Sequence, residues 1–197
     1  PRHTYQVLTK RPARMLEFFS WLNGQVGGPR THVCWEALAA ERRSEWGDQG
    51  PLHTKHCADP DGPWPLPNVW LGVSTEDQAT ADERIPLLLQ VPAAVRFISA
   101  EPMLGMIDLE AIQIPEEREG LRFSALRRQH DDRFGASDTI LDWIIAGGES
   151  GPGARDCRTS WLGSIVEQCK AADVPVFVKQ LGSRPVWSRR VGFGVGE

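Results

Sequence analysis

The chain has 197 residues, of which 41% are hydrophobic and 24% are charged, a composition typical of a globular protein with one substantial core. Its net charge of −4 gives no general basis for nucleic-acid binding, although a local basic patch is compatible with it. No apolar run approaches the length of a membrane span and no secretory signal is present, so we expect a cytoplasmic protein.

The four cysteines, at positions 34, 57, 157 and 169, form neither a Cys-x-x-Cys pair nor a dense disulfide framework. Cys169 falls on the apolar face of a predicted helix and is expected to be a small core residue. A second group of side chains has the atoms that zinc accepts, but its spacing matches no closed zinc site, and no metal site is predicted there. This group consists of Cys34, His53, His56 and Cys57.

The chain begins with a predicted strand, Tyr5–Leu8, which is followed at once by a helix. Pro12 suits the first turn of that helix, where the missing N–H has no partner to lose, and Asn23-Gly24 is a stop signal. The apolar stripe of the helix comprises Met15, Phe18, Phe19 and Leu22. The strand ends in the polar residues Thr9, Lys10 and Arg11. Because the chain has no initiator methionine and enters a strand almost immediately, we expect a processed or truncated start.

Residues 25–67 are rich in Gly, Pro, His and charge, and a connection of this length indicates a lid or an insertion. A second buried strand is predicted over Asn68–Ser74. Ser74 or Thr75 is then expected to cap the next helix, with Asp77 or Gln78 completing a capping box. Pro86 is expected to break that helix after Ile85.

A third strand is predicted over Val95–Ser99, and Pro102 favours an extended conformation for Glu101 directly after it. Residues 107–139 form a second, heavily charged insertion in which Leu121–His130 is predicted to be helical. Its charges are most simply explained as a solvated face.

The stretch Leu141–Arg155 reads LDWIIAGGESGPGAR and combines a short apolar strand with a glycine-rich loop. Glycines at Gly147 and Gly148 allow the backbone to approach a ligand closely, and Glu149 follows the end of the strand. Thr159 is then expected to cap a helix that leads to a fifth strand, Val174–Val178. The tail from residue 183 to 197 is expected to be flexible.

Buried strands separated by helices or long crossovers predict an α/β fold with a parallel sheet, whose strand ends would gather polar groups on one edge. Five strands are too few for an eight-stranded barrel, so the sheet is either open and doubly wound or a partial (β/α) barrel whose N-terminal units are absent. The second possibility predicts one domain over residues 1–182. The polar residues expected at the edge are Thr9, Lys10, Arg11, Ser74, Glu76, Ser99, Glu101, Gly147, Gly148, Glu149, Lys179 and Gln180.

Six motifs in this order resemble the phage Gp thirty-seven/Gp sixty-eight family. They are TKRP (9–12), LPNVWLGVS (66–74), EDQATADERIPLLL (76–89), ISAEPMLG (98–105), DWIIAGGESGPGAR (142–155) and VFVKQLG (176–182). Members of this family resemble radical S-adenosylmethionine (SAM) proteins, which carry a three-cysteine motif for a [4Fe–4S] cluster. That motif is not present here, so the resemblance implies the SAM and substrate part of a parent protein whose cluster motif lies outside this chain.

The resemblance implies roles for the residues at the strand ends. Glu101 and Glu149 are the expected catalytic or substrate-binding acids. A cofactor would be held by Ser74, Glu76, Ser99, Gly147, Gly148 and Ser150. A carboxylate or phosphate of the substrate would be bound by Lys10, Arg11, Arg155 and Lys179.

Two other functions stay open. Glu76, Glu101 and Glu149 could surround a divalent ion in a metal-dependent barrel hydrolase, although no histidine stands at a strand end. Alternatively, the tryptophan-rich insertion and the basic tail could make the chain a non-catalytic module that binds a partner protein or a nucleic acid.

Overall fold

A computed structural model describes residues 3–23, 65–114, 122–128 and 140–187 of the chain. Most of the predicted insertion at 25–67, including Cys34, His53, His56 and Cys57, lies outside the described residues, as do residues 188–197 of the predicted tail. Of the helices in the described ranges, none combines the length and the apolar character needed to cross a membrane.

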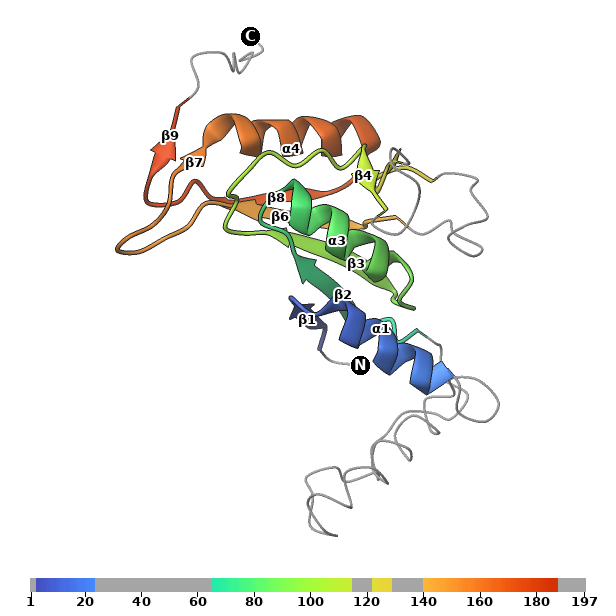
Figure 1. The fold of residues 1–197 in the computed structure, drawn as a ribbon. Coiled ribbons are helices and arrows are strands. Elements are labelled where there is room, and N and C mark those ends of the chain that lie inside the picture. Colours follow the sequence, from blue (N-terminus) through green and yellow to red (C-terminus); the bar gives the residue numbers. More distant parts are fainter. Residues whose placement is uncertain (1–2, 24–64, 115–121, 129–139, 188–197) are drawn as a thin grey trace, which may run out of the picture.

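Five parallel strands form one sheet (Figure 1). They are β1 (Tyr5–Thr9), β2 (Val69–Ser74), β3 (Val95–Ala100), β6 (Trp143–Gly147) and β8 (Val176–Gln180). The strands lie side by side in this same order, and every neighbouring pair is parallel. The α/β prediction is therefore confirmed, and all five carboxyl ends meet at one edge. Because strand order follows chain order, the winding does not reverse as it would in a doubly wound sheet.

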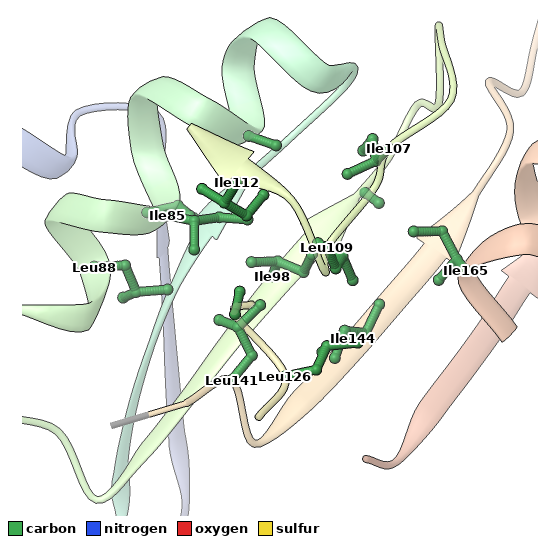
Figure 2. Close-up of a cluster of buried hydrophobic side chains, with 14 of the residues drawn as sticks. Ile85, Leu88, Ile98, Ile107, Leu109, Ile112, Leu126, Leu141, Ile144 and Ile165 are labelled. Carbon is green, nitrogen blue, oxygen red and sulfur yellow. The ribbon is translucent and has the colours of Figure 1, made fainter. Parts of the chain in front are cut away.

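Three helices cover one face of this sheet. They are α1 (Pro12–Asn23), α3 (Gln78–Leu89) and α4 (Thr159–Ala172). Their apolar residues form a single core with alternate residues of β2, β3, β6 and β8, whereas the apolar residues of β1 are exposed. Figure 2 shows Ile85 and Leu88 of α3 near Ile98 of β3, with Ile144 of β6 close to Leu126 and Leu141.

The segment between β3 and β6 adds to this core. Its described residues include the short antiparallel pair β4 (Ile112–Gln113) and β5 (Arg122–Phe123). The Gln168 side chain of α4 accepts a hydrogen bond from Leu109 N (2.7 Å) and donates one to Ile107 O (2.9 Å). The predicted solvated insertion is thus partly a core element, and its buried residues include Ile107, Leu109, Ile112 and Leu126.

No helix of the described residues covers the opposite face, which we call the helix-free face. Residues paired across a parallel sheet point to the same side, so Leu8, Gly72, Phe97 and Trp143 lie in one row on this face. Phe97 and Gly72 are buried because the Phe97 ring lies over Gly72, where a Cβ atom would stand 2.6 Å from ring carbons. The row nearer the carboxyl edge consists of Ser74, Ser99, Ile145 and Phe177.

The start of α3 differs from its prediction. The N-cap is Asp77, whose carboxylate accepts from Thr80 N (2.9 Å), while the Thr80 hydroxyl accepts from Asp77 N (3.1 Å). Ser74 and Thr75 do not cap the helix because the chain continues past the sheet edge before it turns. Pro86 does not end the helix either, since Ile85, Pro86, Leu88 and Leu89 are all buried and packing outweighs the lost backbone hydrogen bond.

Three further expectations differ from the structure. The N-cap of α4 is Arg158, and the Thr159 hydroxyl instead donates to Val186 O (3.3 Å). Residues 122–128 are not helical, because Ala125 N donates to Leu109 O and Ala125 O accepts from Leu141 N, which ties the segment to its neighbours. Residues 183–187 are part of the fold, where β9 (Pro185–Val186) pairs with β7 (Cys157–Arg158).

Candidate functional site

The polar residues predicted at the strand ends do gather at the carboxyl edge of the sheet, but they form separate groups. Two of the groups join different strands or helices, and the third lies within one loop. The groups are Lys10–Glu76–Arg84, Glu101–Lys179 and Glu149–Arg155.

Glu76 is the most buried acid of the edge, with 8% of its surface exposed. Lys10, which follows β1, places its Nζ 2.6 Å from Glu76 Oε1. From α3, Arg84 Nη1 donates both to Glu76 Oε2 (3.0 Å) and to Ser74 O (2.8 Å). One carboxylate therefore joins the ends of β1 and β2 to the covering helix.

The surroundings of Glu76 leave several polar atoms without an aligned hydrogen bond among the described residues. They are Glu76 Oε1, Arg84 Nε and Thr75 Oγ1, all of them buried. Glu76 Oε1 nevertheless lies at ion-pair distance from Lys10 Nζ, so charge rather than hydrogen-bond direction holds this lysine in place.

Glu101 reaches across a strand because that strand has a glycine at the crossing point. It follows β3, and its Oε1 lies 2.5 Å from the position that a Cβ atom on Gly147 of β6 would take. Past Gly147, Glu101 Oε2 lies 3.5 Å from Lys179 Nζ on β8. This distance is longer than a well-formed charge-assisted hydrogen bond, so the pair is loose. Gly147 follows Ala146 of the core, so the Cβ position of Gly147, and with it the Glu101 carboxylate and its partner Lys179, lies on the helix-free face.

Glu149 and Arg155 form a two-bonded ion pair within the glycine-rich loop. Arg155 Nε donates to Glu149 Oε2 (2.7 Å), and Arg155 Nη2 donates to Glu149 Oε1 (2.9 Å). Arg155 N adds a third bond to Oε2 (2.9 Å). These hydrogen bonds lower the pKa of Glu149 from 4.5 to about 2. The hydrogen bonds to Glu149 raise the pKa of Arg155 above its ordinary value.

The remaining predicted residues have varied positions. Ser74 and Ser99 are neighbours in the sheet, and both are buried. Gly148 packs tightly against Leu181 O and the Cys157 side chain. Because glycine has no side chain, the end of β6 and the end of β8 can approach each other closely there. Arg11 and Ser150 are exposed.

The described residues do not fit an iron–sulfur cluster. Cys157 and Cys169 are buried, and burial raises the pKa of both thiols, to about 11 for Cys169. No group of three or more His, Cys, Asp or Glu side chains in the described ranges is arranged to hold a metal ion. The carboxylates of Glu76, Glu101 and Glu149 each face a different cation rather than a shared ion.

Sequence reasoning missed Arg84, which joins Glu76 to the helix. A signal for it exists in the spacing of α3, where Arg84 follows Ala81 by three residues and precedes Leu88 by four. Both of those residues are buried, so an arginine in the same stripe requires an acid partner.

No curated protein and no solved structure matches this chain. A family model does match it, over residues 1–192, and therefore spans both the sheet and the whole carboxyl edge. The chain belongs to the DUF5131 family, which is described as a protein family of unknown function.

Proposed function

We propose that the carboxyl edge of the sheet is the SAM- and substrate-binding part of a radical SAM-like enzyme of partial (β/α)-barrel architecture. The observation that carries this proposal is the Glu101–Gly147–Lys179 crossing. A carboxylate that follows β3 and an ammonium group on β8, which are not neighbouring strands, meet over a glycine of β6 on the helix-free face.

The donor set fits the amino-acid end of SAM, which carries an ammonium and a carboxylate on one carbon. Glu101 would accept the ammonium and Lys179 would bind the carboxylate, so the ligand replaces a loose 3.5 Å pair with two closer ones. Ser74 and Ser99 would offer hydroxyl groups beside them, whereas Ile145 and Phe177 of the same row would contact apolar parts of the ligand.

The described residues do not fit a [4Fe–4S] cluster, because their two cysteines are buried and no three or more of their His, Cys, Asp or Glu side chains are grouped to hold a metal ion. This chain would therefore bind the ligand and position it. Glu101 and Lys179 orient the ligand, and the buried sheet beneath them fixes their positions.

Calorimetric titration of the whole chain with SAM tests this proposal. We expect measurable binding that Glu101→Gln and Lys179→Gln each weaken by about tenfold or more, the usual effect of losing a hydrogen bond to a charged group. Lys170→Gln is the matched control, since Lys170 lies on α4 in an exposed pair with Glu167. Absence of SAM binding, or equal binding by the Glu101 variant and the control, would refute the assignment.

A further inference from the structure

We propose that the small sheet formed by β7 and β9 is the interface of a symmetric dimer of this chain. The two strands pair in parallel, Cys157 with Pro185 and Arg158 with Val186, and they lie next to the start of α4 (Figure 1). Successive residues of a strand point to opposite sides, and Cys157 is buried, so the residues that flank this pair point outward. All four are exposed, and together they form what we call the ribbon face: Asp156, Arg158, Arg184 and Val186.

Trp187 is the apolar anchor of this surface. It follows β9 directly and is 68% exposed, the largest fraction among the large hydrophobic side chains of the described ranges. Val186 beside it is also exposed, at 38%. Covering these side chains removes apolar area from water, and tryptophan and arginine are the residues that most often dominate the binding energy of protein interfaces. The composition of the surface therefore suits contact with another protein.

Arg158 has one side of its guanidinium group engaged and the other side available. Its Cζ atom lies 5.9 Å from the centroid of the Trp161 ring, in the first turn of α4. Asp156 does not neutralise it, because this acid pairs with Arg184 across the ribbon face at 2.9 Å. A tryptophan from a second molecule can stack on the open side of Arg158, a contact that strengthens once water is excluded.

The ribbon face is complementary to itself. Across the two strands, Asp156 stands beside Arg184 and Arg158 stands beside Val186. A two-fold axis in the plane of the face, parallel to the strands, places β9 of a second copy over β7 of the first. Each Asp156 then faces the partner's Arg184, and each Arg158 faces the partner's Val186, next to the partner's Trp187. No like charges oppose each other, and such a contact closes after two subunits.

A second copy fits this surface better than a nucleic acid does. The ribbon face carries an acid, Asp156, together with its two arginines, and the chain has a net charge of −4, so a polyanion would meet repulsion. An apolar anchor surrounded by charges of both signs is instead the usual arrangement of a protein interface, with an apolar centre and a polar rim.

Sedimentation velocity of the whole chain, over about a hundredfold range of concentration, tests the proposal. We expect a reversible monomer–dimer equilibrium that Trp187→Ala weakens by about tenfold or more, as for other central interface tryptophans. Lys170→Gln is the matched control, because Lys170 is an exposed residue of the last turn of α4, whereas the ribbon face adjoins the first turn. Both substituted side chains are exposed, so the urea midpoints should stay close to that of the wild type.

Two charge reversals test the orientation of the copies. Asp156→Arg and Arg184→Asp each set like charges against each other across the two-fold axis, so each variant alone should be monomeric. A mixture of the two should form a dimer with one copy of each, because the two reversed side chains then face each other as an oppositely charged pair. Damage confined to one chain would not be repaired by mixing.

Three results would overturn the inference. They are a wild type that stays monomeric at every concentration, dimerisation that Trp187→Ala leaves unchanged, and a mixture of the charge-reversed variants that does not dimerise. Binding of an oligothymidylate to the monomeric wild type, lost in Trp187→Ala, would assign the surface to a nucleic acid instead. None of these results bears on SAM binding, which depends on Glu101 and Lys179, so the two proposals fail independently.

Discussion

Ile144 and Ile145 are neighbours on β6, but they point to opposite faces of the sheet. Ile144 is fully buried in the core beneath the helices, whereas Ile145 lies on the helix-free face and is partly exposed. The same alternation runs through β2 and β3, where Val73 and Ile98 are in the core and Ser74 and Ser99 are not. The same strands therefore place apolar side chains in the core on one face and the buried hydroxyl groups of Ser74 and Ser99 on the other.

The helix-covered face is the main source of stability, and the helix-free face carries the proposed binding site. Buried apolar area on the covered face is the dominant favourable contribution to folding. Among the described residues, the helix-free face contributes less buried apolar area. Near the carboxyl edge it carries the hydroxyl groups of Ser74 and Ser99, the Glu101 carboxylate and the Lys179 ammonium group. Substitutions on the two faces are consequently expected to have different effects.

The largest effect is expected for Ile144→Ala. Removing three buried carbons from the core should lower the free energy of unfolding by about 2–5 kcal/mol. Ile145→Ala removes the same atoms from the helix-free face and should cost clearly less. Urea unfolding of both variants measures the difference. Equal costs would contradict the comparison and indicate that the helix-free face is buried in solution.

The next effect is expected for Gly147→Ala, because the new Cβ atom would stand 2.5 Å from Glu101 Oε1 and 3.2 Å from Gln180 O. Moving Glu101 aside should cost about 1–3 kcal/mol of unfolding free energy, as for other overpacked sites. Gly105→Ala is the matched control, since its Cβ would meet only Asp77, at 3.3 Å from Asp77 Cβ. If both variants have the same urea midpoint, Glu101 does not lie over Gly147.

A third test uses thiol chemistry to compare the two faces. Cys169 lies on the buried side of α4 and its pKa is raised to about 11, so at pH 8 it should react with iodoacetamide only when the protein unfolds. A cysteine introduced by Ile145→Cys should react faster in the folded protein. Mass spectrometry of the labelled peptides distinguishes the two sites. Rapid labelling of Cys169 without denaturant would place it outside the core.

The smallest effect concerns the pH dependence of Glu149. Its pKa in the folded protein is lowered from 4.5 to about 2, so its contribution to stability is complete above pH 4.5 and is lost as the pH falls toward 2. Carboxyl NMR should show a midpoint near pH 2 in the wild type and a return toward 4.5 in Arg155→Gln. A midpoint that does not respond to the substitution would mean that Arg155 is not the cause.

Much of the fold could be predicted because its signals are local. Short apolar runs located all five strands of the sheet, although β8 begins at Val176, two residues later than expected. Pro12 and Asn23 marked the ends of α1 correctly. The order of strands and helices then predicted the parallel sheet and the common edge for its polar ends. These features depend on residues close together in the chain.

Only the tertiary structure decided which of those polar residues meet. Glu76 finds Arg84 because α3 packs over β2, and Glu101 reaches Lys179 because Gly147 lies between them in space. Packing also kept Pro86 inside a helix against its local preference, and it placed Leu126, which had been predicted in a helix, in a non-helical segment of the core. The physical reason is the same in each case: the free energy of burying and pairing side chains distant in sequence exceeds the small differences among local conformations.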